Sequence, residues 1–195
     1  MPSGPWATGT TTGLYIPPLT GERGATGEYY DKSVNEIARI IDQLEREYSG
    51  DPWHGSPLSQ ILDGVTHTAA TVKPICGGHN IWELVLHMAA WKNEVRHRLS
   101  GAAAAEPREG DWPPVGEVNE VAWIQARERL ELAHRLLVSA IREFPEAKLY
   151  EATNDHRNAA LGIGVTFYEL LHGLVQHDVY HSGQIAILKK GSQQS

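Results

Sequence analysis

The stretch from Phe167 to Leu188 constrains the fold of this chain more than any other. Read at intervals of three and four residues, it forms one helical seam: Phe167, Leu170, Leu174, His177, His181, Gln184 with Ile185, and Leu188. Two consecutive seam positions, where apolar residues are expected, hold His177 and His181. An i, i+4 pair lies on one helix face, so both imidazoles can bind one ion. The alternative is that both are hydrogen-bonded residues of the core.

Composition and charge limit the class of protein. A chain of 195 residues fits one domain. The net charge of −7 and the scattered Lys and Arg residues argue against a nucleic-acid partner. Cys76 is the only cysteine, which excludes an internal disulfide and a cysteine-based zinc motif and suits a reducing cytoplasm. The first residues do not resemble a signal peptide and no apolar run suggests a membrane span, so we expect a cytoplasmic protein.

Capping residues predict where the helices begin. Ser33 and Glu36 have the spacing of a capping box, so the first long helix is expected to begin at Ser33. Asn80 and Glu83 predict the same arrangement for a second helix, over residues 80–99. A short helix over residues 56–62, with a serine cap, is expected in the connection between them.

Two further amphipathic segments, residues 119–144 and a last one starting near residue 166, complete a set of four long helices. No alternating strand pattern accompanies them. The sequence therefore predicts an all-α protein, an antiparallel four-helix bundle with long connecting loops, over residues 29–195. Residues 1–28 are rich in Gly, Pro and Thr and are expected to form an extended or flexible arm.

The same spacing predicts which side chains face the core. In the first helix these are Ile37, Ile40, Ile41, Leu44 and Tyr48. In the third they are Ile124, Leu130, Leu137, Ile141 and Phe144, and His134, close to that face, is interpreted as a packing or hydrogen-bonding histidine. Trp53 is expected to pack over one end of the bundle, and His54 to face solvent.

A third histidine, His87, occupies a seam position of the second helix. Because a bundle gathers facing side chains from different helices, His87, His177 and His181 are expected to form a three-histidine metal site. Three protein ligands leave a position open for water or substrate, which is typical of a catalytic ion. Neutral imidazoles favour zinc, nickel, copper or iron over magnesium or calcium.

Metal-binding histidines also need a partner for their second ring nitrogen. Glu83 lies one turn before His87, and Gln184 lies about one turn after His181, so both are candidates for this role. For Glu83, capping of its own helix is the preferred interpretation.

Two segments resemble the signature segments of DinB-like proteins, the DinB/YfiT family: IWELVLHMAAW and LLHGLVQHDVYHSGQIAILKK. The segment WHGSPLSQILDGVT also resembles a variant of the family, and the resemblance covers roughly residues 31 to 190. It implies an up-down-down-up four-helix bundle, often dimeric, with a divalent metal held by His87, His177 and His181. The N-terminal arm is not part of the family pattern.

Several functions fit these residues. Relatives in the resembled family include transferases and isomerases that use low-molecular-weight thiols, which implies a small-molecule substrate and a thiol S-transferase. A metal-dependent hydrolase fits the open three-histidine site equally well. A metal-binding or ligand-sensing module without turnover, and a purely structural bundle, are the alternatives. We expect zinc or nickel as the cofactor.

A second apolar strip on the last helix predicts a homodimer. The strip consists of Val165, Tyr168, Val175 and Val179, away from the histidine seam. A helix that is apolar on two sides needs two partners, and one of these can come from a second subunit.

Overall fold

The computed structural model describes residues 35–156 and 164–192. These residues form six α-helices: α1 (Glu36–Tyr48), α2 (Leu58–Leu62), α3 (His67–Thr71), α4 (Ile81–Leu99), α5 (Glu120–Glu143) and α6 (Phe167–Ser192). A 3₁₀ turn at Glu146–Lys148 follows α5, and the described ranges contain one isolated bridge, between Ala152 and Thr166, but no strand. The all-α class is therefore confirmed. The expected N-terminal arm lies outside the described residues.

The helix caps agree with the sequence at α4 and α5. At α4 the Asn80 side chain accepts from the Glu83 backbone N–H, and the Glu83 carboxylate accepts from that of Asn80. The side chain of Asn119 caps α5 by accepting from the N–H of Ala122. Both helices begin where the sequence predicts, because a short polar side chain satisfies the free N–H groups of the first turn.

Two predicted caps are wrong. The first helix begins at Glu36 and is capped by Asn35, whose side chain accepts from the N–H of Ala38, so Ser33 is not its cap. Asn and Ser are similarly good N-caps, and spacing alone does not choose between them. At α2 the cap position is Pro57, with no side-chain hydrogen bond, in place of the expected serine.

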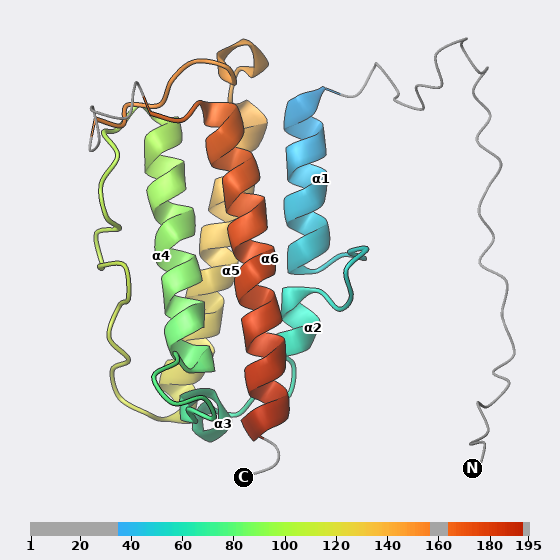
Figure 1. Ribbon diagram of the computed structural model, residues 1–195, viewed down its shortest axis with the longest axis vertical. Coiled ribbons are helices and arrows are strands. Elements are labelled where there is room, and N and C mark those ends of the chain that lie inside the picture. Colours follow the sequence, from blue (N-terminus) through green and yellow to red (C-terminus); the bar gives the residue numbers. More distant parts are fainter. Residues whose placement is uncertain (1–34, 157–163, 193–195) are drawn as a thin grey trace, which may run out of the picture. The chain divides into compact units, whose positions relative to one another are not determined.

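The four long helices pack side by side (Figure 1). α4 contacts α5 and α6, and α1 contacts the same two helices. In Figure 1, α4 and α5 run in one direction, whereas α1 and α6 run in the other. Residues 100–118 connect the end of α4 to the start of α5 and run back along the length of the helices. This connection carries residues of the candidate site. None of the helices in the described ranges is long and apolar enough to cross a membrane.

The core consists of two apolar clusters along the helices. One joins α2, α3, α4, α5 and the end of α6 around Trp82 and Trp123. The other joins α1, α4, α5 and α6 around Leu44, Leu137 and Leu171. Trp123 is fully buried and donates from its indole nitrogen to the carbonyl of Val65 at 2.7 Å.

Two core predictions are wrong. Ile124 is 45% exposed, because the buried face of α5 begins at Trp123, one residue or about 100° away around the helix. Trp53 is fully exposed in the turn between α1 and α2 and covers no bundle end. His54, by contrast, faces solvent as predicted.

Candidate metal centre

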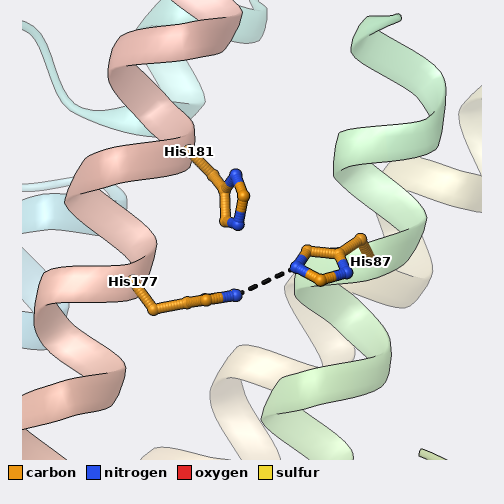
Figure 2. A group of neighbouring side chains, drawn as sticks. All are labelled: His87, His177 and His181. Atoms are coloured by element: carbon orange, nitrogen blue, oxygen red, sulfur yellow. Dashed lines mark hydrogen bonds between the residues drawn. The ribbon is translucent and has the colours of Figure 1, made fainter. Parts of the chain in front are cut away.

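Three histidines from two helices face one another. α4 supplies His87, and successive turns of α6 supply His177 and His181 (Figure 2). One ring nitrogen of each lies within 4.8 Å of the others, and the Nε2 atoms of His87 and His177 are 3.0 Å apart. The three residues that the sequence singles out are therefore brought together.

The outer nitrogen of His87 is held by the connection that precedes α5. His87 Nδ1 lies 2.6 Å from the carbonyl oxygen of Asp111, and the Asp111 carboxylate accepts from the indole N–H of Trp91 at 2.7 Å. The next residue, Trp112, stacks flat on the His87 ring, with centroids 4.0 Å apart. Its indole also stacks on His79, at 3.4 Å. These contacts fix the plane of the His87 ring.

The outer nitrogens of the α6 histidines also face acceptors. His181 Nδ1 lies 2.6 Å from the side-chain oxygen of Gln184, which is the contact that the sequence suggested. His177 Nδ1 lies 3.6 Å from a carboxylate oxygen of Asp178, somewhat longer than a hydrogen bond. The Glu83 carboxylate accepts hydrogen bonds from the backbone N–H of Asn80 and from the Lys73 ammonium. It therefore serves as the cap of α4 and not as a partner of His87.

These partners determine the tautomers. A backbone carbonyl or side-chain amide oxygen only accepts, so the Nδ1 atoms of His87 and His181, each 2.6 Å from one, carry the proton. The Nε2 atoms of His87 and His181 then carry lone pairs, and His177 Nε2 lies 3.0 Å from His87 Nε2. A metal ion between the rings, or a proton on His177 Nε2 that is donated to His87, accounts for this approach. Tetrahedral zinc with bonds of about 2.0–2.1 Å places its nitrogen ligands about 3.3 Å apart, so the donor set fits a transition metal.

Comparison with known protein families gives a match to the DinB superfamily over residues 52–185. This range includes α4, most of α6 and all three histidines. The chain belongs to the DinB superfamily. No curated protein and no solved structure matches the chain.

Burial keeps two of the histidines in this DinB-superfamily chain neutral. It lowers the pKa of His181 to about 4, against the opposing effect of the Gln184 contact. Burial also lowers the pKa of His87, although the Asp111 carbonyl partly offsets this. Both rings are neutral near pH 7, which is the form that binds a metal.

A buried polar layer lies behind His177. Lys92 of α4 donates to Asp178 of α6, and both side chains are fully buried. Burial favours the protonated acid, but the charge of Lys92 and the contact with His177 outweigh it and lower the pKa of Asp178. Beside them, Ser182 donates to Glu47 of α1.

The remaining histidine of the core stays outside the site. His134 is buried and stacks on Tyr48 with ring centroids 4.1 Å apart, so it is the packing histidine that the sequence suggests. Burial, followed by the charge of Lys92, lowers its pKa to about 3.

The sequence does not indicate Asp111 and Trp112 as site residues. From the segment around Pro113 it indicates only that no helix forms there.

Proposed function

We propose that this chain is a metal-dependent enzyme in which His87, His177 and His181 hold one divalent transition metal ion, zinc or nickel. One observation carries the proposal: nitrogen atoms of three imidazoles from two helices converge within 4.8 Å of one another, and the outer nitrogens of His87 and His181 are held by acceptors. A hydrogen bond between His87 and His177 accounts for the approach of two of the three rings, whereas a metal ion accounts for the approach of all three.

A bound divalent ion lowers the pKa of a water or thiol and so provides a nucleophile near neutral pH. The chain's own residues keep the three rings in place: the Asp111 carbonyl and Trp112 hold His87, and Gln184 holds His181. Two aromatic rings, Trp91 and Trp112, border His87 and restrict access of water to it.

Thiol chemistry is the reaction that the site supports best. A thiolate needs no general base beyond the ion, and the carboxylate of Glu83 is already engaged by Asn80 and Lys73. We infer a transferase that joins a low-molecular-weight thiol to a small electrophile. A cytoplasmic location is part of this proposal, since such thiols are kept reduced there.

Hydrolysis is the second candidate. The Asp111 carboxylate is half-exposed at the edge of the site, 3.4 Å from His87 Nδ1, and is the group available to accept a proton from water. Its engagement with Trp91 makes it a weaker candidate for a base than a free carboxylate.

The arrangement of helices is part of the proposal as well. We infer that α1, α4, α5 and α6 form the up-down-down-up four-helix bundle of the DinB-like fold over residues 29–195. The helix directions in Figure 1 support it, as does the packing of α4 and α1 against both α5 and α6.

The test compares turnover by three metal-loaded proteins: wild type, His87→Ala and His97→Ala. His97 is a matched control, because it lies on α4 but outside the three-histidine group. Thiol transfer is assayed with bacillithiol, mycothiol or glutathione plus an electrophile, and hydrolysis with esters and amides. We expect activity in wild type and His97→Ala, and its loss in His87→Ala and after chelation. Equal rates for His87→Ala and wild type would reject the enzyme in favour of a metal-binding or sensing module.

A further inference from the structure

A cavity of about 400 Å³ adjoins His181, one of the three histidines of the candidate metal centre. The metal-centre residue His181 and its partner Gln184 line it directly. The rest of its wall comes from the segment before α4, from α4, from the connection before α5, and from α6. Its large apolar and aromatic side chains are Ile75, Leu84, Trp112, Tyr180, Ile187 and Leu188. A molecule in this cavity therefore touches the metal centre at one end and apolar side chains elsewhere.

The wall of this cavity has no carboxylate, lysine or arginine among the described residues. Besides His181 it includes the imidazole of His79, which lies 3.3 Å from the Glu83 carboxylate. Tyr180 and Ile187 are more than 60% exposed and leave apolar surface open at its rim. Exposed apolar side chains gathered around a concave site are typical of ligand-binding surfaces. A larger groove of about 1000 Å³ between α1, α2 and α5 differs in this respect, since Glu45, Arg127 and Glu131 are among its several charged lining residues. A wall without carboxylates, lysines or arginines thus distinguishes the cavity beside His181 from this groove.

Gln184 adds one polar feature to this wall. Because its side-chain oxygen accepts from His181 Nδ1, its amide orientation is fixed by that contact. The amide nitrogen is then the group that can donate to an oxygen of a bound molecule. The polar end of a ligand is in this way favoured beside His181, and its apolar part farther along the cavity.

We propose that the substrate is an uncharged molecule whose aromatic or hydrocarbon group occupies this cavity, with its reactive polar end beside His181. This inference rests on the proposed metal centre. A thiol that carries carboxylates is disfavoured in the cavity, because the largely apolar wall offers no lysine or arginine to pair with them. The cavity therefore selects the electrophile and leaves the thiol to approach from outside it.

Three hydroxamic acids test the proposal on zinc-loaded protein, because they share one metal-binding head and differ in the tail. Acetohydroxamate has no tail beyond a methyl group, benzohydroxamate has a phenyl ring, and 4-carboxybenzohydroxamate has a charged ring. We expect benzohydroxamate to bind about tenfold or more tightly than acetohydroxamate, as burial of a phenyl group predicts. The carboxylated probe is expected to lose at least that gain. Isothermal titration calorimetry measures all three affinities.

Ile187→Glu, with Tyr180→Ser as a second variant, is expected to abolish the preference for benzohydroxamate while leaving acetohydroxamate affinity unchanged. Tyr150→Glu is the matched control. Tyr150 is exposed and stacks on Tyr168, which lies about 18 Å along α6 from Tyr180. This variant should keep the preference for benzohydroxamate over acetohydroxamate.

Two results would overturn the inference, and they are distinguishable. Equal affinities for the three probes in wild type, or a preference that survives in both cavity variants, would reject the substrate class while the metal centre stands. Failure of the protein to take up zinc in a titration without probes would reject the metal centre, and the substrate class with it.

Discussion

The properties of single side chains around His181 decide how firmly a metal ion can be held. The imidazole is neutral at pH 7, because burial lowers its pKa to about 4, and its outer nitrogen contacts Gln184 at 2.6 Å. A histidine held in this way needs neither deprotonation nor reorientation before it binds a metal.

Replacing Gln184 with Ala should therefore weaken zinc binding by about 10–100-fold, the usual effect of losing a hydrogen-bonding partner of a metal ligand. Gln176→Ala is the control, since Gln176 is exposed on the same helix. Competition with a chromogenic chelator measures both affinities. An unchanged affinity in Gln184→Ala would show that this contact does not position His181.

At the scale of single residues, the sequence predicts contacts between side chains that are close to each other in the chain. His177 and His181 share a helix face, and Gln184 lies three residues beyond, so spacing alone suggested their contact. Asp111 and Trp112 could not be found in this way. Their contacts with His87 span more than 20 residues and depend on how the connection between α4 and α5 returns along the helices.

At the scale of elements, α1 and α6 meet through a buried carboxylate. Burial, together with the charge of Asp178, raises the pKa of Glu47 to about 7. Its unfolded-state pKa is near the ordinary value of 4.5. Between these values the folded protein holds a proton that the unfolded chain has released, so this group's contribution to stability is present below about pH 4.5 and is lost as the pH rises to about 7.

Glu47→Gln should therefore raise the melting temperature relative to wild type at pH 8.5, and raise it much less at pH 4.5. Glutamine keeps the shape of the neutral acid and cannot ionise. Glu45→Gln, an exposed position on the same helix, should show no such pH-dependent difference. Thermal denaturation followed by circular dichroism gives all the values. A Glu47→Gln effect that is the same at both pH values would contradict the raised pKa.

The ion pair of Lys92 and Asp178 joins α4 to α6 with no exposure to solvent. Lys92→Met alone leaves a buried charge without its partner, so it should cost about 3–5 kcal/mol. The double variant Lys92→Met/Asp178→Leu should cost less than the sum of the two single changes. Urea denaturation of the four proteins measures this coupling.

The control cycle replaces Glu131 and Arg135, an exposed pair on α5, with Gln. Exposed pairs of this kind contribute about 0–1 kcal/mol, so its coupling should be near zero. Additive effects at the buried pair would mean that the two charges do not depend on each other.

The sequence predicts the long helices, but it predicts their buried faces only in part. Capping residues located the starts of α4 and α5, because the cap is a local hydrogen bond. The inward face of α5 was misjudged at Ile124, since Trp123 and Ile124 are both apolar and the choice between them depends on the helices packed against α5. Lys92 and Asp178 were not predicted either, because pairing across helices has no sequence signature.

At the scale of the whole molecule, the chain retains apolar surface that it does not cover itself. Tyr168 and Val175 of the predicted dimer strip pack against the chain's own core, whereas Val165 stays exposed. Val121, Ile124 and Leu132 are exposed apolar residues on one face of α5, with the exposed Glu128 between them. A homodimer remains our prediction, with this face of α5 as its interface.

Light scattering should return a mass of about twice 21.5 kDa, and Leu132→Glu should reduce it to that of one chain, because a charge cannot be buried in an apolar interface. Tyr150→Glu, at an exposed position outside α5, is the control and should keep the larger mass. A mass near 21.5 kDa for wild type at high concentration would reject the dimer.

The three-histidine metal centre is the central claim, and metal stoichiometry tests it most directly. Elemental analysis after equilibration with zinc or nickel should give about one ion per chain in wild type. His177→Ala should bind much less, with the helical circular dichroism retained, because the apolar clusters of the core do not depend on the ion. A wild-type protein that takes up neither metal, or a His177→Ala variant that binds as much as wild type, would contradict the claim.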